Sequence, residues 1–544
     1  MSKRIIRIIL FILIAAILLH GCGLPLLPVA TPQPTPEVVE PEEPEPEEPV
    51  VVIPPTPGSF TLRYEPEHTL FTMNPITARN RDNIVLGTLI YESLFILDDN
   101  LRAVPLLCES WETEDNVTFT IRILPDISMH DGSTLTADDV VYSLRQARAR
   151  GRHMSKLRMV SSVSAEDEHT VIIVLESPNA RFIRLLDIPI IKSGTIDYRI
   201  PPGTGPYIFP NPEAMQLTRF ISYRNFDDLP LTTIHLLECN DTDLTDFFDN
   251  GRLSLLWDDP TDAFDVRINR QHEARFYNTT AIQYIGFNAN SNVLRYQDVR
   301  RAIGCSIERQ YIVDNIMNVP RPGQAIAAPT ALSPVFDMYD PDWDIRGDPM
   351  TEMAALIGRV GLEDHFHESF LAMPDGYGNF SRFSLNFIVN IENAHKLNAA
   401  NRIADNLRQY GFNVNVRGLQ WTAFIEALEE GDFDMFYGET LIGADFDLSP
   451  LLLPGEGNLN FGRTGTTAFK PLIDSFLAAE TQEEVSYAGE QLNLAIMQHA
   501  PFIPILYKRY AIYTPTGVLT SAFPGQSGVF HNFQDWALDL YMLN

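Results

Sequence analysis

The sequence has few cysteines and few basic residues for its length. Four cysteines in 544 residues exclude a disulfide-rich scaffold, and they lack the paired spacing of a structural zinc site. The sequence has only 40 lysines and arginines but 71 acidic residues, which gives a net charge of -31. This charge disfavours nucleic acid as a partner. A mean hydropathy of -0.07 excludes a polytopic membrane protein. The hydrophobic share of 45% excludes disorder of the whole chain, and the length predicts two or three domains.

One long hydrophobic run is present, at the start. The positively charged MSKRIIR precedes apolar residues 8–19, which are fewer than the ~20 needed to span a bilayer. The run ends in Leu-His-Gly-Cys, which resembles the lipobox of bacterial lipoproteins, although histidine is unusual at its place. We therefore expect a signal peptide over 1–21 and lipid attachment at Cys22. The alternative is a plain signal anchor with an incidental cysteine.

The segment that follows is rich in proline and glutamate. Residues 28–57 read PVATPQPTPEVVEPEEPEPEEPVVVIPPTP and contain almost no large apolar side chains. Such a stretch cannot bury a core and favours extended, partly polyproline II backbone. We expect residues 22–57 to tether a globular body to the outer face of a membrane.

From residue 59 onward the patterns predict a mixed α/β body. Thr136 is a good N-cap with Asp139 three residues later, so a helix should begin there. Residues 101–107 are expected to form a loop, and 201–207 a rigid loop. Further helices are expected over 299–317, 392–410 and 421–430. Alternating or buried apolar runs predict strands over 60–66, 118–123, 170–178, 281–290, 382–389, 412–419 and 432–439.

The order of several segments resembles a known family. The matching pieces are LIYESLFILDDNLRAVPLLCESWE, FTIRILPDISMHDGSTLTADDVVYSL, GTGPY, IGFNANSNVLRYQDVRRAIGCSIER, QWTAFIEALEEGDFDMFYG and APFIPILYKR. In this order they are similar to the bacterial extracellular solute-binding proteins of family 5, which include oligopeptide-, dipeptide- and nickel-binding lipoproteins of ABC importers. The resemblance implies an α/β, two-lobed periplasmic-binding-protein type II-like fold with an extra inserted domain. It maps lobe I to 58–103, 200–289 and 510–544, the inserted domain to 104–199 and lobe II to 290–509.

The resemblance also implies a function. The protein would capture a peptide or similar small solute between two closing lobes and deliver it to a membrane permease and ATPase complex. It would be a monomer without cofactor, metal or catalytic residues, lipid-anchored to the cell membrane and facing the exterior, or the periplasm where an outer membrane exists. One alternative is a surface receptor that senses a solute on the same fold. Another is an exported hydrolase, for which motifs such as G-x-S-x-G are absent.

Five residues are implied as ligand-binding. In peptide-binding relatives an aspartate pairs with the ligand's α-amino group, and its counterpart in LIGADFDLSP is Asp445, with Gly443 beside it. The alternative is that Asp445 is only a solvated or turn-capping aspartate. As a cleft residue it should be solvated while the lobes are open. Trp421 matches a tryptophan that lines the pocket, or it anchors its helix in the core. Tyr91 and Glu92 match a segment that approaches the cleft, where Glu92 could instead be a structural hydrogen-bonding residue.

The loop also departs from the family. Peptide-binding relatives carry Gly-Trp where this chain has Leu441-Ile442, and DMFYGETLIGAD contains none of the arginines that clamp a free carboxylate. Asp445 and Asp447 could form a glycosidase-like carboxylate pair. His365 and His367 could suggest nickel or zinc.

With Cys22 lipidated, an odd number of cysteines remains, namely Cys108, Cys239 and Cys305. At least one should therefore be unpaired and buried as a small apolar residue.

Overall fold

A computed structural model describes residues 59–64, 72–262, 267–319, 321–343, 349–367, 370–455 and 459–543. The expected signal peptide 1–21, the lipid site Cys22 and the tether 22–57 lie outside the described residues. Within those ranges no helix combines the length and the apolar character needed to cross a membrane.

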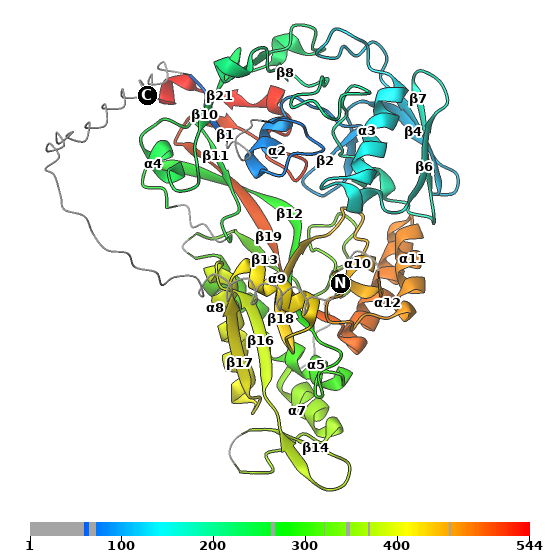
Figure 1. Cartoon of the computed structure of the whole chain (residues 1–544), viewed down its shortest axis with the longest axis vertical. Helices are drawn as coiled ribbons and strands as arrows, with labels where there is room; N and C mark the ends of the chain where they lie inside the picture. Colours follow the sequence, from blue (N-terminus) through cyan, green and yellow to red (C-terminus); the bar gives the residue numbers. More distant parts are fainter. Residues whose placement is uncertain are drawn as a thin grey trace, which may run out of the picture. The chain divides into compact units, whose positions relative to one another are not determined.

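Two four-stranded sheets form from the first half of the chain (Figure 1). The first has the order β1 (Thr61–Tyr64), β10 (Thr233–Glu238), β9 (Gln216–Arg219) and β8 (Tyr207–Ile208), with β1 and β10 parallel. The second is antiparallel, in the order β4 (Cys108–Glu112), β5 (Thr118–Ile123), β7 (Thr170–Leu175) and β6 (Val160–Ala165). A single hydrophobic core joins both sheets, because apolar side chains of β1, β5, β7, β9 and β10 belong to one buried cluster.

A seven-stranded sheet is built mainly from the second half. Its order is β11 (Leu256–Asp258), β19 (Phe502–Pro515), β12 (His272–Phe287), β18 (Met435–Leu441), β16 (Leu385–Asn390) and β17 (Val414–Leu419), and β13 (Ala325–Ala327) also pairs with β19. Three two-stranded sheets complete the strands: β2 (Phe95–Leu97) with β3 (Ala103–Pro105), β14 (Ala372–Pro374) with β15 (Phe380–Arg382), and β20 (Leu519–Ser521) with β21 (Ala537–Leu538).

Helices cover both faces of the large sheet. Successive side chains of a strand point to opposite faces, so Tyr284 and Phe436 enter one core while Ile285 and Tyr437 enter another. The first core is closed by α9, α11 and α12, and the second by α5, α7 and α8. The α-helices are α2 (Arg81–Gly87), α3 (Ala137–Ala149), α4 (Leu244–Asp249), α5 (Gln297–Cys305), α6 (Arg309–Ile312), α7 (Pro349–Val360), α8 (Ala394–Gln409), α9 (Trp421–Glu430), α10 (Ser449–Leu452), α11 (Lys470–Ala478) and α12 (Gln482–His499).

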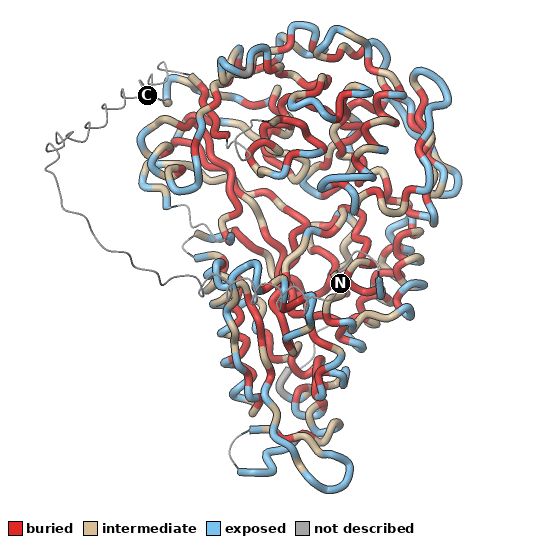
Figure 2. The backbone as a smooth tube through the Cα atoms, viewed as in Figure 1, coloured by how far each residue is buried: buried red, intermediate tan, exposed pale blue. Residues whose placement is uncertain are grey.

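The long strands β12 and β19 run from one half of this body to the other (Figures 1 and 2). One end of β19 pairs with β11, whereas the far end of β12 pairs with β18. The β12–β19 register shifts between Asn278 and Ile282. A bulge of this kind bends a strand and increases its twist, so the ribbon is irregular where the two halves meet.

Most local predictions are confirmed, with two corrections. The capping box of Thr136 and Asp139 is present at the start of α3, and α8 and α9 form as expected. The single helix expected over 299–317 is wrong, because α5 ends at Cys305 and a π-helix occupies Val313–Met317. Asn406 stabilises the break by donating from Nδ2 to the carbonyl of Ser306 at 3.1 Å. The loop expected over 101–107 contains β3, which pairs with β2, a strand that lies before residue 101.

Candidate functional site

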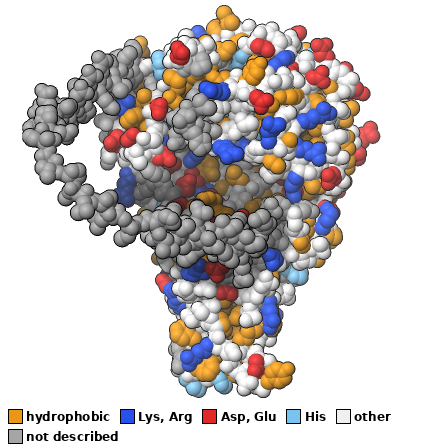
Figure 3. Space-filling model, viewed as in Figure 1, with side chains coloured by type: hydrophobic (Ala, Val, Ile, Leu, Met, Phe, Trp, Pro, Cys, Tyr) orange, Lys and Arg blue, Asp and Glu red, His pale blue; other side chains and the backbone are white. Residues whose placement is uncertain are grey.

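A cavity of about 1020 Å³, here called the central cavity, is lined by several parts of the chain. Its wall includes side chains of α2, the segments 91–93, 152–159 and 525–534, and the end of β18. Pockets that enclose small molecules commonly measure ~300–1,000 Å³. On the face drawn in Figure 3, basic and acidic side chains are interspersed over the surface. The volume of the central cavity is therefore large enough for a small solute.

Tyr91 and Glu92 both line the central cavity, and their polar atoms are bound within the protein. The hydroxyl of buried Tyr91 donates to the carbonyl of Pro201 at 3.0 Å. Glu92 is 4% exposed and accepts hydrogen bonds from Arg224 at 2.8 and 2.6 Å. Glu92 thus forms the structural hydrogen bonds of the second interpretation, and ligand binding by either residue stays a prediction.

The glycines of the GTGPY segment explain how Tyr91 is held. A Cβ on Gly203 would lie 2.5 Å from a ring carbon of Tyr91, and one on Gly205 would lie 2.4 Å from the backbone carbon of Ile90. The amide of Gly205 donates to the carbonyl of Ile90 at 2.9 Å. Only glycine permits this approach, so the motif fixes the segment that carries Tyr91 and Glu92.

Asp445 and Gly443 also line the cavity, on the loop after β18. Asp445 is 2% exposed, and its carboxylate accepts a hydrogen bond from Nδ2 of Asn179 at 2.8 Å. Burial raises the pKa of Asp445, whereas Asn179 and the charge of Arg181 oppose this rise. In this structure Asp445 is buried, because residues distant in sequence cover it. Pairing of Asp445 or contact of Gly443 with a ligand stays a prediction.

Trp421 lies at the start of α9, away from the lining of the central cavity. Its side chain is 53% exposed and stacks on Phe424 with ring centroids 6.1 Å apart. The core-anchor interpretation is wrong, since Phe424, Ala427 and Leu428 are the buried residues of this helix. Contact of Trp421 with a ligand stays a prediction.

Basic residues of the cavity were missed by sequence reasoning. Five line it, namely Arg79, Arg81, Arg152, Lys156 and Arg158. Ion pairs join Lys156 to Asp187 and Arg158 to Asp447. The signal was available, because RQARARGRHMSKLR over 145–158 is unusually basic for so acidic a chain.

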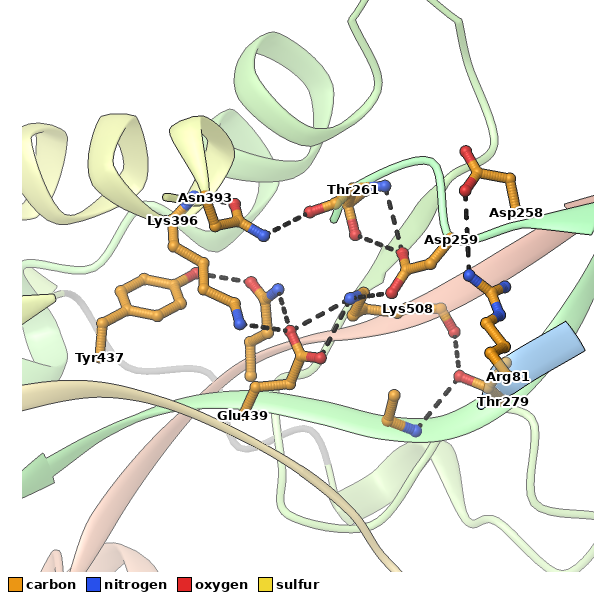
Figure 4. Close-up of polar contacts among 12 residues, drawn as sticks. Arg81, Asp258, Asp259, Thr261, Thr279, Asn393, Lys396, Tyr437, Glu439 and Lys508 are labelled. Atoms are coloured by element: carbon orange, nitrogen blue, oxygen red, sulfur yellow. Dashed lines mark hydrogen bonds and ion pairs between the residues drawn. The ribbon is translucent and has the colours of Figure 1, made fainter. Parts of the chain in front are cut away.

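A buried ionic network lies beside the cavity (Figure 4). Nζ of Lys508 on β19 contacts Asp259 and lies 3.0 Å from Oε1 of Glu439 on β18. Glu439 is also 3.0 Å from Nζ of Lys396 on α8. Burial alone would raise the pKa of Glu439, but the charges of Lys508 and Lys396 lower it to about 2. The network thus joins Asp259, which directly follows β11, to β18, β19 and α8; burial raises the pKa of Asp259, and the charge of Lys508 opposes that rise.

Next to this network, Arg81 lies 3.8 Å from the carboxylate of Asp258 and over the ring of Tyr510. Burial raises the pKa of Asp258 to about 7, although Arg81 acts to lower it. Since Arg81 lines the cavity, the protonation state of Asp258 changes the net charge next to the cavity wall.

In the described part of the chain, few side chains are arranged as a glycosidase-like carboxylate pair or a metal site would require. Asp445 and Asp447 both accept internal hydrogen bonds, the latter also from Ser449. Nowhere among the described residues do three or more His, Cys, Asp or Glu side chains gather as metal ligands. His365 stacks on Phe380 with centroids 4.2 Å apart. The three described cysteines are free thiols, with Cys108 and Cys239 buried and Cys305 half-buried.

Comparison with known proteins identifies relatives over most of the chain. The model of "Bacterial extracellular solute-binding proteins, family 5 Middle" matches residues 102–457. Heme-binding protein A of Haemophilus influenzae is 22% identical over 74% of this chain and 78% of its own length.

Solved structures resemble the fold. The oligopeptide-binding protein AppA of Bacillus subtilis, in complex with a nonapeptide, aligns with a TM-score of 0.65 at 19% identity, over 88% of this chain and 99% of its own. NikA of Brucella suis, in complex with Fe(III)-EDTA, aligns with a TM-score of 0.70 at 16% identity, over 88% and 100%. The expected periplasmic-binding-protein type II-like fold is confirmed. Members of the matched family are extracellular or periplasmic solute-binding proteins rather than enzymes. The chain belongs to the bacterial extracellular solute-binding proteins of family 5.

Proposed function

We propose that this protein is the substrate-binding lipoprotein of an ABC importer. It captures a peptide or similar small solute outside the cell and delivers it to a membrane permease, while a lipid on Cys22 and the 22–57 tether hold it at the membrane. Its relatives are consistent with several solutes, since their names and complexes specify heme, a nonapeptide and Fe(III)-EDTA. The comparisons favour solute capture over hydrolysis. The class of ligand has to be inferred from the residues that line the cavity.

The central cavity is the observation that carries this proposal. Its volume of about 1020 Å³ suits a small solute, and its lining comes from segments far apart in the sequence. Tyr91, Glu92, Gly443 and Asp445 all line it, and we propose all four as wall residues of the ligand site. Trp421 is proposed only as a contact at the outside of the site.

We further propose the division into two lobes and an inserted domain given above. The antiparallel sheet of β4 to β7 falls entirely within 104–199, and β16, β17 and β18 fall within 290–509. β19 spans the boundary at 509–510, and together with β12 it would serve as the hinge ribbon. Ligand contacts with both lobes exist only when they are closed, so binding would shift the population toward the closed state.

Identification of bound solute tests the proposal. The full chain is purified gently, denatured, and the released small molecules are identified by mass spectrometry. Calorimetric titration with the identified solute should then give nanomolar to micromolar affinity at one site. Incubation with the same solute, followed by product analysis, should return it unchanged. Turnover of the solute would support the hydrolase instead, and a protein that neither carries nor binds any solute would refute solute capture.

A further inference from the structure

We propose that the solute captured in the central cavity is an organic anion with a largely apolar body, held through its negative group by Arg152. This inference rests on the proposed function, because it assumes that the cavity receives a solute. It names the chemical class of that solute and the residue that selects it.

The first observation is the charge balance of the cavity wall. Five basic side chains and four carboxylates line it, in a chain whose net charge is -31. Burial lowers the pKa of His153 and of His531, so both histidines of the wall are neutral at pH 7. The cavity wall thus carries a slight positive charge, although the protein as a whole is strongly acidic. The acidic surface repels anions, whereas the cavity wall favours one.

The second observation is that the carboxylates of the wall are already bound by other side chains. Asp187 pairs with Lys156, and Asp447 pairs with Arg158. Glu92 is bound by Arg224 from outside the cavity. Asp445 is buried under Asn179 and has no exposed face to offer an ammonium group. A cationic solute would therefore have to displace an internal partner from whichever carboxylate it approached.

Arg152 differs from the other basic residues of the wall. It is exposed to solvent, lines the cavity, and forms no hydrogen bond or ion pair with the described residues. Burial of its guanidinium lowers the pKa of Arg152, and the charge of Asp187 opposes this; that carboxylate is itself bound by Lys156. The planar guanidinium of an arginine offers a fork of donors that matches carboxylate and phosphate groups, and it stays charged at all physiological pH values.

The rest of the lining indicates the body of the solute. Apolar and aromatic side chains also line the cavity, among them Met154, Met159, Leu185, Leu441 and Phe530. A fully hydrophilic anion would leave these surfaces in contact with polar groups, whereas an apolar body would cover them at ~25 cal/mol per Å² of buried surface. An anionic head with an apolar body satisfies both parts of the wall.

The test uses a panel of matched pairs on the full chain purified in detergent. Each anionic member is paired with a neutral analogue of the same shape: N-acetyl tripeptides with their amides, arylalkanoic acids with their amides, and aryl phosphate monoesters with their alcohols. Thermal shift identifies the members that bind, and calorimetric titration gives their affinities. We expect anionic members to bind at least ~10-fold more tightly than their neutral partners.

Variants assign the effect to one residue. Arg152→Gln should lower the affinity for anionic members roughly 10-fold to 100-fold, and Arg152→Lys should retain much of it because the charge remains. Arg150→Gln is the matched control, since Arg150 is exposed two residues earlier and does not line the cavity. Arg152→Gln should melt close to the wild type without solute, because its side chain loses no hydrogen bond or ion pair with the described residues.

The outcomes separate the inference from the function. Binding of the neutral members only, or anion binding that survives Arg152→Gln, overturns the inference while solute capture stands. Failure of the wild type to bind any member of the panel, together with no solute released on denaturation, overturns solute capture itself and the inference with it.

Discussion

Replacing Lys508 with methionine should cost more stability than any surface change in this protein. The side chain of Lys508 is 0% exposed, and its ammonium contacts Asp259 and both oxygens of Glu439, the latter at 3.0 and 3.2 Å. Methionine fills a similar volume without charge, so the variant removes the ion pair of Asp259 and leaves Glu439 paired with Lys396. Breaking a buried ion pair by removing one partner typically costs about 3–5 kcal/mol, because the remaining charge stays buried.

The loss should depend on pH with a definite sign. Glu439 has a folded pKa of about 2, below its unfolded value, so its contribution is complete above pH ~4.5 and is lost as the pH falls through 2. Without Lys508 the pKa of Glu439 is lowered less, so the buried carboxylates can take up protons at higher pH. The difference between wild type and Lys508→Met should therefore be greatest near pH 7 and become smaller toward pH 4.

Urea denaturation of both proteins at pH 7 and pH 4.5 measures the effect, and two further variants control it. Lys470→Met removes an exposed lysine that pairs with Asp474 across one helical turn, and it should cost only about 0.5 kcal/mol or less. Lys508→Met combined with Asp259→Asn should recover part of the loss, because one buried charge is then removed. A loss below about 1 kcal/mol at pH 7, or one that does not vary with pH, would refute the idea that these charges depend on one another.

Three further predictions concern the cavity wall and the anchor. The folded pKa of Asp258 is about 7, above its unfolded value, so wild-type stability should decrease from pH 5 to pH 8 relative to Asp258→Asn by about 2–3 kcal/mol; parallel denaturation series would contradict this if they do not diverge. Asp445→Asn should lower the melting temperature without ligand, at a cost of about 1–3 kcal/mol, because the hydrogen bond from Asn179 loses a charged acceptor; an unchanged melting curve would argue against a structural role. Cys22→Ala should abolish incorporation of labelled lipid and leave the protein uncleaved or released into the medium, whereas lipid labelling that persists would exclude this cysteine as the attachment site.

Local patterns predicted much of the fold, because they depend on neighbours in sequence. The capping box of α3 involves residues three apart, and the apolar spacing of α9 is complete within ten residues. The sequence also places Gly203 in a stiff loop, although the reason, its contact with Tyr91, depends on the fold. Elements defined by a few neighbours were therefore predicted well.

The site was predicted less well, because its contacts join distant segments. Asp445 is covered by Asn179, 266 residues away, and no local signal announces that pairing. The charges around Lys508 come from strands that meet only in the assembled sheet. Arg152 could have been singled out from its basic neighbourhood, but its lack of a partner is a property of the fold alone.

The long sequence separation between β19 and its partners β11 and β12 has a consequence for how the protein is made. This strand lies between β11 and β12, with Leu256 opposite Tyr513 and Phe276 opposite Ala511. During synthesis or export the earlier strands emerge long before their partner, and such long-range pairing is slow to form. Until then β11 and β12 expose unpaired edges that proteases and other strands can reach. Emergence of β19, rather than the folding of either earlier strand, thus sets the moment at which these edges become protected.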